Sequence, residues 1–268
     1  MNIKLVIFDF DGTIADTRKA IIISKQETMR LLGLSVASDE ECAATIGLSS
    51  KLGFKKQYPD LSEEQLDLCV STYRERFEKN KLLEPPVLFP NVKEVLDSLS
   101  KKEIVSTIAT SRNKVSCKEF LDQLEISSYF SYVLCAEDTK LLKPNPDPVI
   151  KTLKELSYSP SETLVVGDMP MDIEMGKKAG AYTCGVTYGN ATRADLLAAG
   201  ADFIIDDIGE IIMRSILEEL FYGNVCPNTD CRSKDKETKE LIGYIADHHS
   251  ALNETLTDKQ KEIFEKFN

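Results

Sequence analysis

Two acids follow the first apolar run of the chain, in the segment Phe8-Asp9-Phe10-Asp11-Gly12-Thr13. Asp9 and Asp11 are two residues apart, so on an extended chain both carboxylates project to the same side. Gly12 permits a sharp turn directly after them. Two like charges this close repel each other unless a cation or a proton lies between them. The pattern indicates a Mg²⁺ site with a carboxylate nucleophile and an acid/base neighbour, whereas the simpler interpretation is a solvated strand end followed by a turn.

A second pair of acids lies in Gly167-Asp168-Met169-Pro170-Met171-Asp172. If a helix begins near Pro170, Asp168 ends a strand and Asp172 lies in the first helical turn, so both can face one site. Taken alone, they are explained equally well as a turn residue and as a charge at a helix N-terminus. Together with Asp9 and Asp11 they would form an acidic bowl for Mg²⁺, which favours oxygen ligands and keeps several waters.

Three further residues are candidates for holding an anionic oxygen. Thr110 offers a hydroxyl at the end of an apolar strand, and its backbone N–H and that of Ser111 are potential donors. Lys143 supplies a positive point charge in a loop that the following prolines stiffen. Read separately, Thr110 is a plain strand-end hydroxyl and Lys143 is a solvated lysine. Their joint occurrence with the four acids, in this order, favours a common site.

Alternating strands and helices are expected to position these groups. The first strand, over residues 3–8, carries a continuous apolar run and should be buried on both faces. Further short strands are expected at residues 104–109, 132–136, 163–166 and 182–186, with helical segments between them. This alternation predicts an α/β fold with a doubly wound parallel sheet. Ligands bind beyond the carboxyl ends of such strands, where the candidate residues lie.

An all-helical unit is expected between the first strand and the rest of the sheet. Residues 16–85 are rich in Lys, Glu, Gln and Leu at helical spacing and contain no strand-like run. Thr17 and Ser62 are the expected helix caps, and Ser62 is followed by acids in the first turn. The sequence thus predicts a core of residues 1–15 and 86–212, a helical insert of residues 16–85 and a helical C-terminal extension of residues 213–268.

Composition restricts the partners and the compartment. The 268-residue chain carries a formal net charge of −11, which argues against nucleic acid and anionic membranes as main partners. It has no apolar stretch of about 18 residues, and its short N-terminal apolar run ends in an acid, unlike a signal peptide. Seven scattered cysteines fit reduced thiols of a cytoplasmic protein, and Cys69, Cys135 and Cys184 are expected to be core residues.

Four segments in this order closely resemble the motifs of the haloacid dehalogenase-like hydrolase superfamily, over roughly residues 1–212. They are Asp9-Phe10-Asp11-Gly12-Thr13, Thr110, Lys143-Pro144 and Gly167-Asp168-Met169-Pro170-Met171-Asp172. The helical insert matches the subgroup that has a helical cap. Within it, Gly185-Val186-Thr187-Tyr188-Gly189 and Ala199-Gly200-Ala201-Asp202 look most like phosphoglycolate phosphatases.

The resemblance implies a Mg²⁺-dependent phosphatase that acts on a small phosphorylated metabolite. Asp9 would attack phosphorus and form an aspartyl-phosphate, and Asp11 would protonate the leaving alkoxide and then deprotonate water. Thr110 and Lys143 would hold the non-bridging oxygens. The implied Mg²⁺ ligands are the Asp9 carboxylate, the Asp11 main-chain carbonyl and Asp168, with Asp172 in support.

Two alternatives remain open at this point. The acid at position 11 favours phosphate esters over dehalogenation or phosphonate cleavage, but a sugar-phosphate mutase would need it too. The insert is expected to choose the substrate, because its loop Thr45-Ile46-Gly47-Leu48-Ser49-Ser50 resembles the one that points at the site in this subgroup. Lys51, Lys55 and Lys56 are candidates to meet a second anionic group, or else they form a solvated helix face.

The segment from about Tyr222 onward lies outside the hydrolase pattern and resembles a small uncharacterised bacterial helical family. Its Cys226, Cys231, His248 and His249 suggest zinc, but neighbouring histidines on a helix point in different directions and rarely reach one ion. A helical hairpin that packs on the hydrolase domain or on a partner is the favoured interpretation. A partner-binding or self-associating role of this extension is therefore the second alternative.

Overall fold

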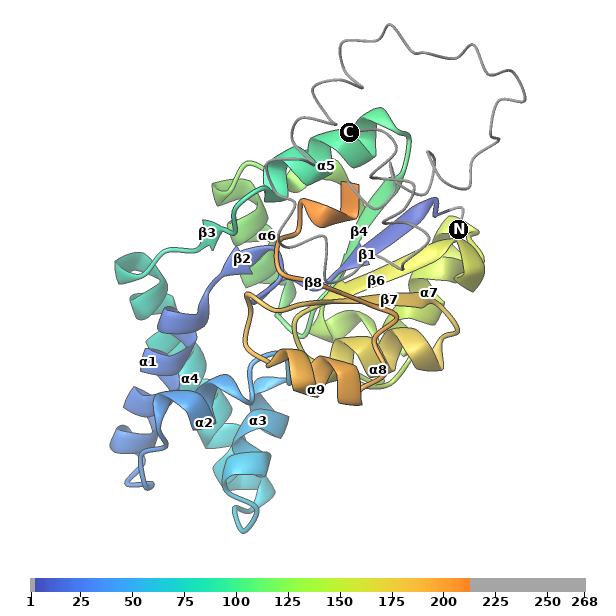
Figure 1. Cartoon of the computed structure of the whole chain (residues 1–268). Helices are drawn as coiled ribbons and strands as arrows, with labels where there is room; N and C mark the ends of the chain where they lie inside the picture. The colour runs from blue at the N-terminus through green and yellow to red at the C-terminus, as the bar shows by residue number, and fades with distance from the viewer. Residues whose placement is uncertain (1–2, 213–268) are drawn as a thin grey trace, which may run out of the picture. The chain divides into compact units, whose positions relative to one another are not determined.

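The computed structural model describes residues 3–212, which belong to the first of two compact units, residues 1–218 and 219–268. Figure 1 shows this unit as a central sheet flanked by helices, with the first four helices grouped apart from the sheet. The predicted helical hairpin and the zinc candidates of the C-terminal extension lie outside the described residues.

A parallel sheet of six strands forms the core, in the order β5-β4-β1-β6-β7-β8. This arrangement confirms the predicted α/β fold and places β1 in the interior of the sheet, where apolar residues must cover both faces. The strands are β1 (Leu5–Phe8), β4 (Val105–Ala109), β5 (Phe130–Leu134), β6 (Thr163–Gly167), β7 (Tyr182–Val186) and β8 (Phe203–Ile205).

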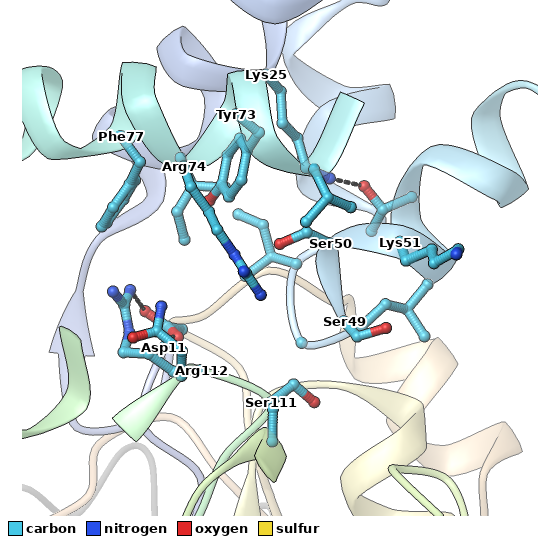
Figure 2. A pocket seen from close by; sticks show the side chains of 18 of the residues that line it. Asp11, Lys25, Ser49, Ser50, Lys51, Tyr73, Arg74, Phe77, Ser111 and Arg112 are labelled. Carbon is cyan, nitrogen blue, oxygen red and sulfur yellow. Dashed lines mark hydrogen bonds and ion pairs between the residues drawn. The ribbon is translucent and has the colours of Figure 1, made fainter. Parts of the chain in front are cut away.

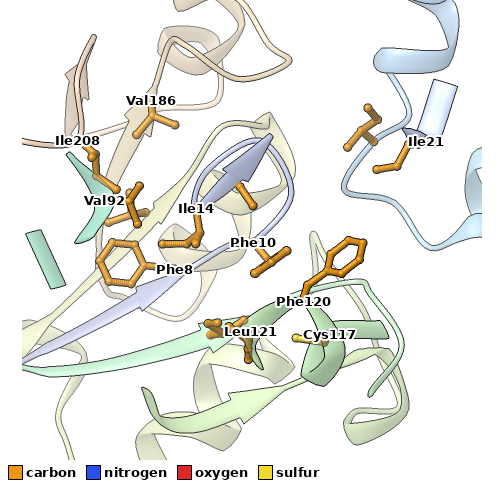
Figure 3. Close-up of a cluster of buried hydrophobic side chains, with 14 of the residues drawn as sticks. Phe8, Phe10, Ile14, Ile21, Val92, Cys117, Phe120, Leu121, Val186 and Ile208 are labelled. Carbon is orange, nitrogen blue, oxygen red and sulfur yellow. The ribbon is translucent and has the colours of Figure 1, made fainter. Parts of the chain in front are cut away.

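Helices cover both faces of the sheet, as the alternation along β1 requires. Val6 and Phe8 join the larger core cluster with residues of α5 (Val92–Lys101) and α6 (Lys114–Gln123), part of which Figure 3 shows. Leu5 and Ile7 point the other way, into a cluster with residues of α7 (Asp147–Leu156) and α8 (Pro170–Lys178). Each such side chain contributes roughly 1.5–3 kcal/mol on burial, so the strand that carries Asp9 is firmly anchored.

The insert between β1 and β4 consists of four helices. They are α1 (Arg18–Leu31), α2 (Asp39–Ala43), α3 (Ser50–Gln57) and α4 (Glu63–Leu83). The chain enters and leaves it through β2 (Ala15–Asp16) and β3 (Val87–Leu88), which pair antiparallel. Ser62 caps α4 as predicted, because its hydroxyl accepts from the N–H of Gln65. Thr17 occupies the N-cap position of α1 but makes no capping bond, so the prediction of its role was wrong.

Other elements differ from the sequence expectation at short or edge segments. β5 runs over 130–134 rather than 132–136, because its pairing with β4 begins at Phe130 and contains an irregularity. The two-residue strands, the edge strand β8 and α9 (Arg193–Ala198) were not predicted, since they are too short to show periodicity. Three 3₁₀ turns complete the described part, at Ser127–Tyr129, Ala136–Asp138 and Pro160–Glu162. Within residues 3–212, no helix combines the length and apolar character needed to cross a bilayer.

Candidate active site

Three buried carboxylates meet at the carboxyl end of the sheet. Asp9 follows β1, Asp168 follows β6 and Asp172 lies in the first turn of α8, and their closest oxygens all lie within 4.8 Å of one another. Lys143, from the loop before α7, places its Nζ 2.5 Å from Asp9 Oδ1 and 2.6 Å from Asp172 Oδ1. The structure thus brings together four of the residues that the sequence nominated, from four separate segments.

The electrostatics of this cluster are dominated by burial. Burial raises the pKa of Asp9 well above its usual range against the lowering effect of Lys143, and Asp172 adds to the rise. Burial, then the charge of Asp172, raises the pKa of Asp168 to about 7, although Asn190 donates two bonds that oppose the rise. For Lys143, burial lowers the pKa, but the contacts with Asp172 and Asp9 outweigh it and the net pKa is raised. One lysine does not neutralise three buried acids.

The donor set fits a magnesium ion. With all three carboxylates ionised, the site would carry two negative charges beyond the one that Lys143 neutralises, and a divalent cation would balance them. Asp9 Oδ2 is buried and has no hydrogen-bond partner among the described residues, so it has a lone pair free for an ion. All donors are oxygens, which Mg²⁺ prefers.

Gly12 allows the chain to pass close to this cluster. Its φ is +89°, a left-handed conformation that favours glycine, and a Cβ there would lie 2.3 Å from Asp168 Oδ2. Thr13 and Asn190 complete the surroundings of Asp168. The Thr13 hydroxyl donates to Oδ1 at 3.2 Å, and the backbone N–H and Nδ2 of Asn190 donate to Oδ2 at 2.8 and 2.9 Å. Asp168 is therefore held in one orientation from both sides.

The Asp11 carboxylate belongs to a different group of charges. Arg112 donates to both of its oxygens, from Nε at 3.1 Å and from Nη2, and the Thr17 hydroxyl donates to Oδ1 at 2.5 Å. The expected bowl of four carboxylates is therefore a cluster of three, and the fourth acid has its own cation. The reason is that the chain bends at Phe10 and turns over residues 12–14 instead of continuing as a strand, so the two-residue spacing no longer puts both side chains on one side.

Thr110 and Ser111 lie where β4 ends, as expected, but one predicted donor is already used. The Thr110 N–H donates to the carbonyl of Leu134 at 2.9 Å, so the prediction that it binds an anion was wrong. Its hydroxyl accepts from the Arg112 N–H at 3.1 Å and remains able to donate. Ser111 lines a cavity between the sheet edge and the insert, together with Thr110.

That cavity has a volume of about 370 Å³ and is bounded below by the core and above by the insert (Figure 2). Asp11, Ser111 and Arg112 form its floor, and the loop over residues 45–51 together with α4 forms its roof. The position of the loop agrees with the expectation that it points at the site. The size is at the lower end for small-molecule pockets, so the site suits a small metabolite.

Two residues that contact the candidate acids escaped sequence reasoning although a signal was present. Arg112 directly follows Thr110 and Ser111 at a strand end, and its side chain is 6% exposed. Asn190 follows β7 and also accepts a bond of 3.0 Å from Arg18 Nη1. Both occupy carboxyl ends of parallel strands, which is the place where a binding residue is expected in this fold.

The described cysteines behave as predicted from composition. Cys69, Cys135 and Cys184 are buried, and neither they nor Cys42 and Cys117 form a disulfide. They therefore act as small core residues in the described part of the chain.

Residues 6–186 match the family of haloacid dehalogenase-like hydrolases. The chain belongs to this family. Residues 213–268 match a separate family of unknown function, in agreement with the weaker resemblance seen in the sequence. The division lies close to the boundary between the two compact units.

Similar proteins cover the hydrolase part of the chain. A phosphoglycolate phosphatase of Aquifex aeolicus is 31% identical over 69% of this chain and 85% of its own length. The pyrophosphatase PpaX of Oceanobacillus iheyensis is 30% identical over 79% of this chain and 96% of its own. The crystal structure of a predicted phosphatase from Clostridium acetobutylicum has a TM-score of 0.74 and 25% identity, covering 81% of this chain and all of that one.

Proposed function

We propose that this haloacid dehalogenase-like hydrolase is a Mg²⁺-dependent phosphatase that hydrolyses a small phosphomonoester of the phosphoglycolate or sugar-phosphate type. The observation that supports it most is the cluster of Asp9, Asp168, Asp172 and Lys143 at one end of the sheet, with Asp9 Oδ2 unpaired among the described residues. The names of the relatives, a phosphoglycolate phosphatase and a pyrophosphatase, support phosphate chemistry.

In this mechanism Asp9 is the nucleophile and forms an aspartyl-phosphate. Lys143 contacts Oδ1, and Oδ2 has no hydrogen-bond partner among the described residues, so one oxygen of the carboxylate can attack phosphorus while the other is left for the ion. Lys143 also balances charge on the transferring phosphoryl group, and the Thr110 hydroxyl donates to one of its oxygens. Asp9, the Asp11 carbonyl and Asp168 would hold Mg²⁺, with Asp172 in support. Bound there, the ion supplies charge neutralisation at the phosphoryl oxygens.

Asp11 is the acid/base in this proposal. It protonates the leaving alkoxide and later takes a proton from the water that hydrolyses the aspartyl-phosphate. In the structure its two oxygens are occupied by Arg112 and Thr17, so it must exchange at least one of these partners before it reaches a substrate. Thr17 directly follows β2, which pairs with β3, so this exchange of partners would take place where the chain enters the insert.

The test is the release of inorganic phosphate from phosphomonoesters in the presence of Mg²⁺. Asp9→Asn should abolish release, because an amide is not a nucleophile, and full activity of that variant would contradict the proposal. A phosphomutase, the alternative from the sequence, would interconvert sugar phosphates without net phosphate release and would require a bisphosphate primer. Measuring free phosphate and product isomers in one assay separates the two.

A partner-binding role of residues 213–268 remains a prediction. The match to the pyrophosphatase PpaX spans 96% of that protein but 79% of this chain, and the hydrolase family matches residues 6–186. This supports placing catalysis in the hydrolase part. Cleaving the chain after residue 218 should leave phosphate release unchanged, whereas loss of activity would assign the extension to the site. A cytoplasmic location is part of the same proposal, and the described cysteines, which form no disulfide, support it.

A further inference from the structure

The roof of the cavity carries two cations that the proposed chemistry does not use. They are Lys25 of α1 and Arg74 of α4, and both line the cavity above Asp11 and Thr110. Figure 2 shows the Arg74 guanidinium extending from α4 into the space between the helices of the insert and Arg112. Neither residue was singled out from the sequence, where both resemble solvated charges on a helix.

Lys25 is 3% exposed, an unusual state for a lysine that forms no ion pair with an acid among residues 3–212. Its Nζ donates to the Thr45 hydroxyl and, at 3.4 Å, to the carbonyl of Cys42. Thr45 in turn donates to the same carbonyl at 2.8 Å. An ammonium has three donors, and these two neutral acceptors do not balance its charge. Burial lowers the pKa of Lys25 to about 8, which shows how little compensation it has.

Arg74 is exposed and makes no ion pair or hydrogen bond within the described part of the chain. It therefore carries a full positive charge at the cavity wall. Since arginine presents a planar fork of donors, it is well suited to a carboxylate or a phosphoryl group.

The other charged side chains that line the cavity already have partners. Asp11 pairs with Arg112, Glu78 pairs with Lys81 at 2.5 Å, and Lys51 pairs with Glu63 and Asp67 at 2.9 and 2.6 Å. The three lysines that the sequence nominated for a second anionic group are therefore not available in the cavity. Lys51 is paired with acids, Lys55 donates to the carbonyl of Leu61, and Lys56 does not line the cavity. Among the described lining residues, the uncompensated charge is that of Lys25 and Arg74.

From this arrangement we infer that Lys25 and Arg74 form a subsite for a second anionic group of the substrate. The inference rests on the proposed function, because the first group is the phosphoryl held near Thr110 and Lys143. It narrows the substrate to a small phosphomonoester or phosphoanhydride with a carboxylate or second phosphoryl group at its far end. A neutral sugar would leave both cations without a counter-charge in a cavity of about 370 Å³.

Binding of two non-hydrolysable ligands tests this inference directly. 3-Phosphonopropionate has a phosphonate at one end and a carboxylate at the other, whereas propylphosphonate has the same backbone and a neutral end. Calorimetric titration of the full chain with Mg²⁺ should give at least tenfold tighter binding of 3-phosphonopropionate than of propylphosphonate. Imidodiphosphate, titrated in the same way, shows whether a second phosphoryl group is preferred to the carboxylate. Tighter binding of imidodiphosphate or of 3-phosphonopropionate than of propylphosphonate supports the inference.

Single substitutions of Lys25 and Arg74 test whether these residues cause the tighter binding of 3-phosphonopropionate. Arg74→Gln and Lys25→Met should each reduce the ratio of the two affinities toward one. Lys56→Gln and Arg30→Gln also remove one charge each from exposed positions of the insert that do not line the cavity, and they should keep the wild-type ratio. Equal reduction by all four would show that the general field of the insert is responsible and would overturn the subsite.

The inference and the proposed function fail in different ways. If the wild type binds both phosphonates equally well, the subsite is absent, whether or not phosphate is released from any ester. If 3-phosphonopropionate is preferred but no ester or anhydride is hydrolysed, the subsite stands and the proposed hydrolysis is wrong. Unchanged preference in both Arg74→Gln and Lys25→Met would also exclude these residues.

Discussion

Arg112 donates two hydrogen bonds to the Asp11 carboxylate, one from Nε to Oδ2 at 3.1 Å and one from Nη2 to Oδ1. The same guanidinium lies over the rings of Phe120 and Phe77, with its central carbon 4.5 and 5.1 Å from their centroids. Phe77 belongs to the insert and Phe120 to the core. Arg112 therefore links the proposed acid/base to the insert.

Removing this arginine should cost stability. Arg112→Met leaves the Asp11 carboxylate buried without its counter-ion, and breaking a buried pair in this way costs about 3–5 kcal/mol. Urea unfolding should show that loss, and adding Asp11→Asn in a double variant should restore much of it. Lys118→Met provides the control, because the Lys118–Asp122 pair is exposed and should contribute less than about 1 kcal/mol. Equal costs for both single variants would contradict the account.

Magnesium should stabilise the fold through the three acids. An ion that binds only the folded state at ten times its dissociation constant adds about 1.4 kcal/mol, so the melting temperature should rise with Mg²⁺ and fall when a chelator is added. Asp168→Asn should remove most of this response, because it takes away one ligand charge. Asp195→Asn is a matched control at an exposed helix cap. If the melting temperature of the wild type does not change with Mg²⁺, the proposed Mg²⁺ site of the three acids is contradicted.

Lys25 should destabilise the folded protein at neutral pH. Its pKa is about 8 in the fold and 10.5 in the unfolded chain, so protonation favours unfolding. Below pH 8 both states are charged and the full cost, on the order of 3 kcal/mol, applies. Between pH 8 and 10.5 the folded state releases its proton and the cost declines. Lys25→Met should therefore be more stable than the wild type at pH 7, and the difference should shrink by pH 10.

Denaturant unfolding at pH 7 and pH 10 measures the difference in unfolding free energy between Lys25→Met and the wild type. The titration of all other groups is the same in both proteins, so it cancels in this difference. A lysine kept only for structure would give the opposite sign, with Lys25→Met less stable at pH 7. Stabilisation combined with the loss of ligand preference would show that the lysine is retained for binding.

Gly12 should resist even the smallest side chain. Gly12→Ala adds a Cβ 2.3 Å from Asp168 Oδ2 and also strains a positive φ, so we expect a loss of about 2–4 kcal/mol and of the Mg²⁺ response. Gly33 has a φ of +68° with open space around its Cβ, so Gly33→Ala carries the backbone strain alone, roughly 1 kcal/mol. Thermal unfolding compares them, and equal losses would show that contact with Asp168 is unimportant.

The sequence alone predicted the elements with strong periodicity and the residues at their ends. The buried run of β1, the strands that end at Ala109 and Gly167 and the Ser62 cap are local patterns, so neighbouring residues suffice to predict them. Parallel topology then requires that residues at the carboxyl ends of strands share one edge. For that reason Asp9, Asp168 and Lys143 could be nominated together before any contact was known.

Only the tertiary structure decided how the charges pair. The bend at Phe10 separates the Asp11 side chain from that of Asp9. Asp11 pairs instead with Arg112, which is 101 residues away in the sequence. Packing of α1 against α4 buries Lys25, although a lysine in a helix resembles a solvated residue from sequence alone. Charge pairing depends on distances between segments far apart in the chain, which periodicity and spacing do not encode. Local patterns were therefore enough to nominate the acids and to show the family resemblance that implies phosphate chemistry, whereas the cations proposed for a second anionic group appeared only in the folded cavity.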